Sequence, residues 1–232
     1  MNLPALADMT LAETLKELEA LGTAQNRKIY RRHGASEKLF GVSFANLNAL
    51  KKRIKIDHAL ALELWKSGND DARTLAIMIA DPARLTDRVL NDWARGLNGF
   101  VVSTFPGLVG RTPLARKKME DWIDAPSEWT SCAGWALLAH LALNDAGLPD
   151  SFFTARLRVI EKEIHGRPNW ARDAMNSALI AIGVRNPPLT KAALKVAKAI
   201  GKVEVDHGET SCKTADAAAY IQKTLAHRQR KK

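Results

Sequence analysis

The stretch Trp129-Thr-Ser-Cys-Ala-Gly-Trp135 decides the fold, because a second stretch, Trp170-Ala-Arg-Asp-Ala-Met-Asn176, repeats its design. Each follows a short loop with a proline, Pro126 in the first and Pro168 in the second, and each opens a helix rich in alanine. A weaker copy begins at Asn69. A loop-then-helix unit that recurs every 30 to 40 residues, roughly, is typical of stacked helical repeats.

Helix signals run through most of the chain. Thr10 and Glu13 form a capping box, in which each side chain satisfies a free amide of the first turn. Pro106 and Gly107 predict a short or distorted helix within 100–110. Further caps, apolar faces and glycine stops predict helices at 24–33, 43–54, 57–67, 69–80, 86–98, 112–123, 129–144, 153–164, 170–182, 190–200 and 214–227.

Alternation with period two is nearly absent, and the one strand candidate, 202–206, is too short to build a sheet. The predicted fold class is therefore all-α. We expect a HEAT-like or ARM-type α-solenoid of antiparallel helix pairs with a concave basic face. We also expect residues 1–232 to form a single domain, with a basic C-terminal tail at about 227–232.

Positive charge dominates the surface chemistry. The 232 residues carry a net charge of +10. Many of the lysines and arginines stand in clusters. Such clusters neutralise neighbouring phosphates and displace condensed counterions, so nucleic acid is the expected partner. A basic surface that only aids solubility is the alternative. The clusters are Arg27-Lys28, Arg31-Arg32, Lys51-Lys52-Arg53, Arg116-Lys117-Lys118 and Arg228-Gln-Arg-Lys-Lys232.

The sequence favours a cytoplasmic protein without a membrane anchor. It has no apolar run of membrane-spanning length and no signal-peptide pattern. Its two cysteines, Cys132 and Cys212, form no disulfide framework. Gly-rich phosphate loops and the common zinc-hydrolase motif are absent from the sequence. We therefore expect no metal, no small-molecule cofactor and a monomer.

Several motifs together resemble the DNA alkylation repair family, the HEAT-like helical-repeat DNA glycosylases. They are Gly41-Val42 with Lys51-Lys52, Leu64-Trp65 with Asp71-Ala-Arg73, and Trp93 ahead of the irregular segment ending at Gly110. The resemblance spans residues 25–185 and implies a solenoid that cradles duplex DNA. In such glycosylases aromatic residues hold the lesion, an arginine binds the phosphate, and a carboxylate stabilises the cationic sugar.

The sequence departs from that catalytic pattern. The resemblance implies a Trp with an Asp four residues later, where this chain has Phe100 and Thr104. No acidic residue lies between Asp92 and Glu120. The arginine implied just after Trp129 is replaced by Thr-Ser-Cys-Ala, and a later aromatic residue by Met-Asn-Ser-Ala. We therefore expect that the usual catalytic residues of the family are replaced.

The loop Asp206-His-Gly-Glu-Thr-Ser-Cys-Lys213 concentrates reactive side chains. Asp206 and His207 are candidate groups for a relocated catalytic site, and Cys212 is a candidate thiolate assisted by Lys213. The alternative is a polar connector in which Thr214 caps the next helix. A zinc site is not expected, since structural zinc takes four ligands and the loop supplies only His207 and Cys212.

A second set of residues is expected to contact DNA. Arg172 and Asn176 share a helix face that can offer a guanidinium to phosphate and an amide to a base edge. Packing or solvated surface is the alternative for each member, and packing is expected for Trp65, Trp93 and Trp122. The predicted DNA-binding set is Arg73, Arg111, Arg116, Lys117, Trp170, Arg172, Asn176 and Lys213.

The leading prediction is a DNA-binding protein that holds duplex or alkylation-damaged DNA in a concave basic groove. One alternative is an active base-excision glycosylase for alkylated purines, with Asp206 or His207 in the relocated site. The other is a non-enzymatic HEAT-repeat scaffold for protein interactions. Base release separates the first two, and salt-dependent DNA binding separates both from the third.

Overall fold

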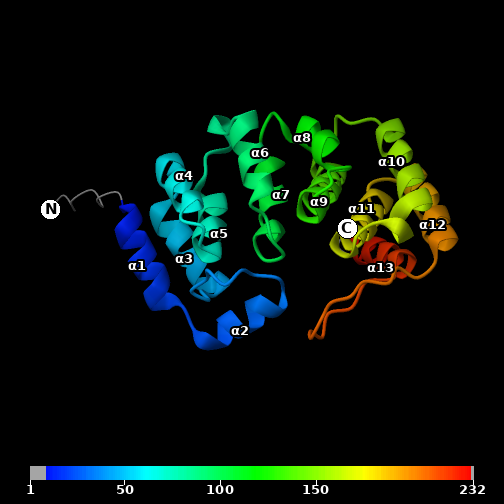
Figure 1. Ribbon diagram of the computed structural model, residues 1–232. Coiled ribbons are helices and arrows are strands. Elements are labelled where there is room, and N and C mark those ends of the chain that lie inside the picture. Colours follow the sequence, from blue (N-terminus) through cyan, green and yellow to red (C-terminus); the bar gives the residue numbers. More distant parts are fainter. Residues whose placement is uncertain (1–8, 231–232) are drawn as a thin grey trace. The chain divides into compact units, whose positions relative to one another are not determined.

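The structure, a computed structural model, describes residues 9–230, which form helices joined by loops (Figure 1). Strands are absent from this range, and its only β-type pairing is an isolated antiparallel bridge between Gly22 and Val42. The all-α prediction is confirmed. Of the predicted basic tail, residues 227–229 instead belong to the last helix, and residues 231–232 lie outside the described range.

The chain divides into two compact units, Met1–Leu108 and Val109–Lys232. The expectation of a single domain stays a prediction. The helices up to residue 109 are α1 (Leu11–Leu21), α2 (Ala24–Arg32), α3 (Phe44–Ile54), α4 (His58–Lys66), α5 (Asp70–Ile79), η1 (Pro82–Arg84), α6 (Asp87–Arg95), η2 (Val101–Ser103) and α7 (Phe105–Val109). Those that follow are α8 (Ala115–Trp122), α9 (Glu128–Asn144), α10 (Asp150–Glu163), η3 (Ile164–Gly166), α11 (Asn169–Gly183), α12 (Pro187–Ile200) and α13 (Ala217–Gln229).

The first unit is built around α5, which packs against α3 and α4. The apolar faces predicted from helical spacing are buried there, as Leu47, Leu64 and Leu75 show with no exposed surface. Trp65 and Trp93 stack with their ring centroids 4.5 Å apart and their planes 10° from parallel. Both indoles are buried, which confirms that these two tryptophans belong to the core.

Two adjacent carboxylates at the start of α5 fix the segment that joins α2 to α3. Asp71 is fully buried and accepts the backbone amides of Phe40, Gly41 and Val42 at 2.7, 2.9 and 3.0 Å. Its neighbour Asp70 accepts the amide of Ser36 at 2.6 Å. Burial raises the pKa of the Asp71 carboxyl, while the three amides act to lower it. The joining segment therefore depends on two buried carboxylates, of which Asp71 accepts most of the bonds.

In the second unit the two repeated stretches meet, since α9 packs against α11. Trp129 and Trp170 stack at 5.9 Å, and the Trp170 amide donates to Glu128 Oε1 at 2.7 Å. Gly134 lets α9 approach the end of α8, because a Cβ there would lie 2.5 Å from the Ile123 nitrogen. The first stretch is thus a packing motif.

Several helix starts differ from the sequence prediction. The helix expected at 153–164 begins at Asp150. The helix expected from Thr112 begins at Ala115, because the Thr112 hydroxyl donates to the Val109 carbonyl and accepts only the Leu114 amide, which precedes the helix. The helix expected from residue 190 begins at Pro187, capped by Asn186. The last one begins at Ala217 with Asp216 as its cap, since Thr214 instead bonds the His207 ring. The irregular helix within 100–110 is confirmed as η2 and α7.

Replacing Asp71 with Ala is expected to destabilise the protein by about 3 kcal/mol, because it leaves three buried amides without an acceptor. Urea unfolding measures the change. The control is Asp92→Ala, at an exposed carboxylate of α6, which should change stability by less than about 1 kcal/mol. Equal unfolding midpoints for the two variants would contradict the role given to Asp71.

Replacing Gly134 with Ala is expected to cost roughly 1 to 3 kcal/mol, although alanine favours helices, because the new methyl meets backbone that cannot rotate away. The same change at Gly166, where no atom lies within 4 Å of the added Cβ, serves as the control. Thermal unfolding should rank the Gly134 variant well below the Gly166 variant, and the reverse order would refute the close approach.

Candidate nucleic-acid interface

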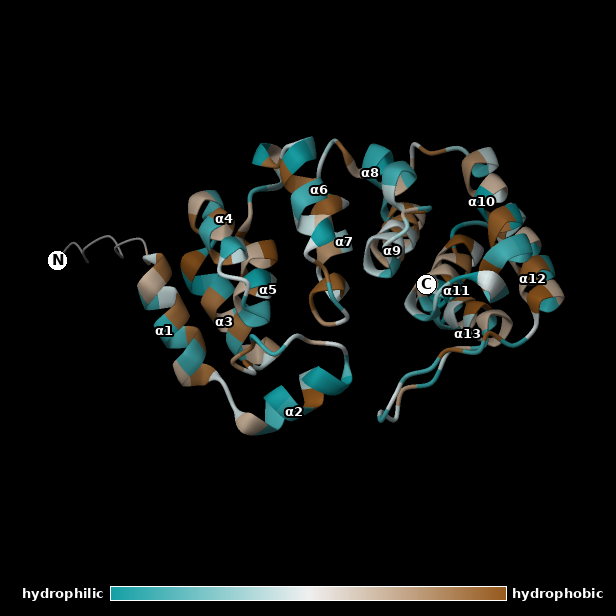
Figure 2. Ribbon diagram, viewed as in Figure 1, coloured by the Kyte–Doolittle hydropathy of each residue, from teal (hydrophilic) through white to brown (hydrophobic). Residues whose placement is uncertain are grey.

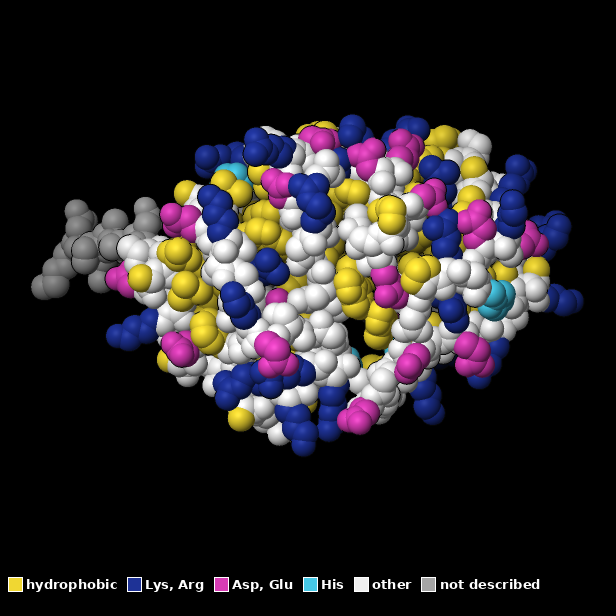
Figure 3. All heavy atoms as spheres, in the orientation of Figure 1, with side chains coloured by type: hydrophobic (Ala, Val, Ile, Leu, Met, Phe, Trp, Pro, Cys, Tyr) yellow, Lys and Arg dark blue, Asp and Glu magenta, His cyan; other side chains and the backbone are white. Residues whose placement is uncertain are grey.

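The α2 helix carries a basic surface in the first unit. Its sequence, AQNRKIYRR, contains no acidic residue, and Lys28, Arg31 and Arg32 are exposed. Figure 2 shows α2 as largely hydrophilic, and Figure 3 shows Lys and Arg side chains gathered over it. An isolated helix of this length is marginal in water, so its position must come from tertiary contacts.

Those contacts run to the segment that Asp71 holds. Arg27 donates to the Phe40 carbonyl at 3.1 Å, and the Tyr30 hydroxyl donates to the Val42 carbonyl at 3.1 Å. The Tyr30 ring also packs on Phe100, with the centroids 4.4 Å apart. One side of α2 is therefore anchored, and the exposed cations lie on the remainder. The sequence marked these cations as a cluster but could not show what holds them.

The segment implied to carry the catalytic pair serves packing instead. Phe100 is 5% exposed and packs between Tyr30 and Phe44, while the Thr104 hydroxyl donates to the Val101 carbonyl at 3.2 Å. Neither side chain can act as an acid or a base at neutral pH. The place where the family resemblance implies a catalytic carboxylate thus has none.

Arg73, a member of the predicted DNA-binding set, is used internally. Its guanidinium lies over the Trp65 ring at 5.1 Å and donates to the Gly96 carbonyl at 3.2 Å. These contacts tie α5 to the end of α6, so the side chain serves the core of the first unit. The sequence placed it correctly near a helix start but could not show the direction of its side chain.

The three cations of the basic cluster on α8 differ in their exposure to solvent. Arg116 and Lys117 are exposed and pair with Glu120 and Asp121 one helical turn later. Lys118 has no exposed surface; its ammonium bonds Asp121 at 2.5 Å and lies 5.6 Å from the Trp122 ring centroid. Only part of the predicted cluster is therefore available to a phosphate. Arg111, just before α8, is exposed.

The residues 201–216, which we call the strap, run from α12 to α13 without regular structure (Figure 1). Three side chains of α11 hold its backbone. Asn169 exchanges two bonds of 2.7 Å with Asp206, Arg172 donates to the Glu204 carbonyl at 2.6 Å, and Asn176 donates to the Ala215 carbonyl at 2.9 Å. Asn176 is 2% exposed, and its amide nitrogen and the Arg172 guanidinium secure the strap.

The reactive residues of the strap are partly occupied as well. Asp206 Oδ1 accepts the Gly208 amide at 2.8 Å. The His207 ring meets the edge of Trp170 at 5.7 Å and bonds the Thr214 hydroxyl at 2.9 Å. Cys212 and Lys213 are exposed. The structure thus places His207 beside Trp170, on the helix that also carries Arg172. This proximity could not be predicted, because His207 lies far from both residues in the sequence.

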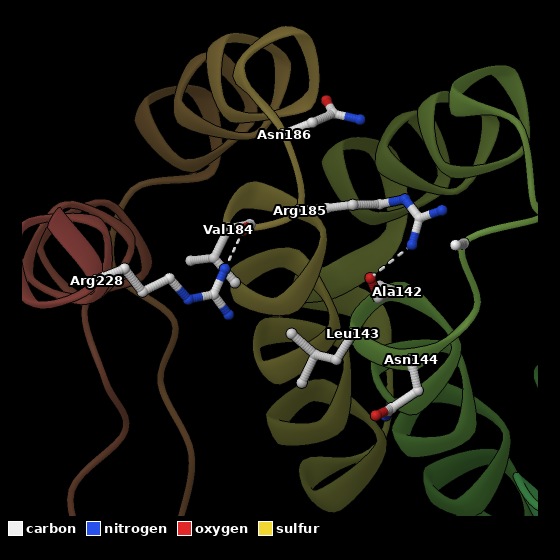
Figure 4. Close-up of a pocket in the computed structure, with 8 residues that line it drawn as sticks. Ala142, Leu143, Asn144, Val184, Arg185, Asn186 and Arg228 are labelled. Carbon is white, nitrogen blue, oxygen red and sulfur yellow. Dashed lines mark hydrogen bonds between the residues drawn. The ribbon is translucent and has the colours of Figure 1, made fainter. Parts of the chain in front are cut away.

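Several pockets of the second unit adjoin α13. The one in Figure 4 has a volume of about 330 Å³; in it Arg185 donates to the Ala142 carbonyl at 2.8 Å and Arg228 to the Val184 carbonyl at 2.5 Å. Another, of about 540 Å³, includes Asp173 and His207 in its lining. No sequence motif indicated either pocket, because each is lined by residues that lie far apart in the sequence.

Neither a membrane nor a bound metal is indicated by the residues that the structure describes. None of their helices is long and apolar enough to cross a membrane. Within residues 9–230, no three His, Cys, Asp or Glu side chains lie close enough together to hold a metal ion.

The fold and this surface define a helical-repeat protein with basic, surface-exposed helices, and the comparisons assign the class. The profile described as "DNA alkylation repair enzyme" matches residues 14–221. The chain belongs to this family. The resemblance inferred from its motifs is therefore confirmed.

Individual members of known sequence or structure are also similar to this chain. A solved structure described as a new family of proteins related to the HEAT-like repeat DNA glycosylases, with affinity for branched DNA structures, is 30% identical. The match covers 95% of both chains with a TM-score of 0.87. Uncharacterized proteins of Listeria innocua and Listeria monocytogenes are 29% and 28% identical over 89% of this chain and 93% of theirs.

The two thiols are expected to differ sharply in reactivity. Burial, followed by the nearby carboxylates of Asp173 and Glu128, raises the pKa of the Cys132 thiol to about 12. At pH 8 on the order of one Cys132 in ten thousand is then a thiolate, the reactive form. Ellman's reagent should titrate the exposed Cys212 at once and Cys132 only on unfolding. A fast thiol that survives Cys212→Ser would refute this.

Proposed function

We propose that this protein binds DNA without excising bases, and that it prefers branched DNA to linear duplex. The observation that carries the proposal is α2, an acid-free helix that is held in place through Arg27, Tyr30 and Asp71 and that carries exposed cations. A basic helix that is already fixed loses less backbone freedom on meeting phosphates than a frayed basic tail would, so its position favours binding.

Family membership and the described affinity of the 30% identical relative for branched DNA support the choice of partner. The absence of a carboxylate between Asp92 and Glu120 supports the non-catalytic part, since cleavage of a cationic base needs an anion beside the sugar. We assign the phosphate contacts to α2 and to the exposed members of the predicted set, Arg111, Arg116, Lys117 and Lys213.

Fluorescence anisotropy with a three-way junction and a duplex of equal length tests the partner. The junction should bind more tightly, and affinity should fall steeply with salt. Changing Lys28, Arg31 and Arg32 together to Ala should reduce the slope of log K against log salt by about 2 to 3, near 0.9 per lost phosphate contact. A flat salt response would refute DNA binding.

The matched control removes three exposed lysines from α12, Lys191, Lys195 and Lys198, and so makes the same change in net charge. It should leave the slope nearly unchanged. An equal effect of both triple variants would show that net charge acts, rather than α2.

A base-release assay on alkylated DNA tests the non-catalytic part. No methylated purine should be released above the level of a no-protein blank. Release that disappears in Asp206→Asn or His207→Ala would instead support the relocated catalytic site and overturn this part of the proposal.

A further inference from the structure

The 540 Å³ pocket of the second unit lies between one face of α11 and one face of α13, with α9 below and the strap at its edge. Tyr220, Thr224 and Arg228 recur every four residues along α13, so they line a single wall. Ala139, Ile180 and Ala181 supply apolar surface. Its volume falls within the range of small-molecule sites, which are mostly apolar with a few placed polar groups.

Hydrogen-bond acceptors gather on the α11 side. Asp173 and Asn176 stand three residues apart and face the pocket together. The hydrogen bonds among residues 9–230 include none to the Asp173 carboxylate, although burial raises the pKa of this group and the nearby His207 lowers it. The bond from Asn176 Nδ2 to Ala215 fixes the amide, which leaves Oδ1 as a buried acceptor without a partner in that range.

Cations lie at other points of the lining. Lys213 comes from the strap and Arg228 from α13, and both are exposed. Arg228 also lines the neighbouring pocket, where Figure 4 shows it directed toward Val184. A ligand suited to this lining therefore has N–H donors for the acceptors on α11, a flat apolar body, and negative charge for Lys213 and Arg228.

We propose that this pocket binds the guanine base of a nucleotide, with Asp173 accepting from its Watson–Crick edge and with Arg228 and Lys213 near its phosphate. Guanine alone among the DNA bases places two adjacent N–H donors on that edge, which match both oxygens of a carboxylate. Adenine and cytosine put a ring acceptor beside their amino group, and thymine flanks its single N–H with two carbonyls; each would face the carboxylate with a lone pair.

The inference rests on the proposed function and sharpens it. Branched DNA offers nucleotides that are unpaired or poorly stacked, and removing such a base from its stack costs the least energy. Docking one guanine at Asp173 gives a reason for the protein to favour a branch point over duplex. The His207 and Tyr220 rings also line the pocket and add aromatic surface for a base to pack against.

Titration of the full-length protein with dGMP, dAMP, dCMP and thymidine monophosphate, followed by amide NMR signals, tests the pocket without DNA. Signals of α11, α13 and the strap should shift, with dGMP bound roughly tenfold to a hundredfold more tightly than the others. Equal affinity for all four, or no dGMP binding at about 10 mM, overturns the proposal.

Replacing Asp173 with Asn supplies a test that misfolding cannot imitate. The amide offers one acceptor and one donor, which match the N–H and neighbouring carbonyl of xanthine. The affinity of the variant for dGMP should fall roughly tenfold or more, and its affinity for deoxyxanthosine monophosphate should rise by a similar factor. The exposed-site control Asp92→Asn should bind dGMP like the wild type. Unchanged dGMP affinity in Asp173→Asn overturns the assignment.

Binding to a fully paired junction separates the two proposals. If the Asp173→Asn variant binds this junction like the wild type while dGMP selectivity is absent from both, only the guanine pocket is refuted. If neither protein binds any DNA, yet dGMP selectivity follows residue 173, the DNA-binding function is refuted and the pocket stands.

Discussion

The buried carboxylate of Asp71 is the contact on which the first unit depends. Three consecutive backbone amides of residues 40–42 converge on it, and without it they would lack this acceptor in a site closed to water. Because Arg27 and Tyr30 bind the carbonyls of the same segment, the position of the basic helix α2 also depends on Asp71. A single acceptor in the core thus determines where surface cations stand.

The second unit uses the same chemistry in a different arrangement. Here α11 offers Asn169, Arg172 and Asn176 along one side, and each bonds to a backbone carbonyl of the strap. Holding the strap brings His207 against Trp170 and completes the pocket that contains Asp173. Arg172 and Asn176, which the sequence predicted as DNA contacts, therefore hold the strap. The group beside them that can bind a ligand is Asp173.

The residues that cap helices show which local features can be predicted from the sequence. Thr10 was correctly predicted as a helix cap, and Ser43, Asp57 and Asn69 cap the helices predicted beside them, because a cap acts on amides within its own first turn. Thr112 and Thr214, which stand where two other helices were expected to begin, cap neither of them. Their hydroxyls bond Val109 and His207, and a local pattern cannot show which of two nearby partners prevails.

The sequence by itself determined the all-α class, the family and the absence of a carboxylate where the family resemblance implies one, since helical period and residue identity are local properties. Only the tertiary structure decided which cations reach solvent. In the sequence Lys118 looks like its exposed neighbour Lys117, yet it is buried beside Trp122. Arg73 looks like a free cation near a helix start, yet it lies over Trp65. The free energy that orients a long side chain comes from partners distant in the chain, and these meet only when the helices pack.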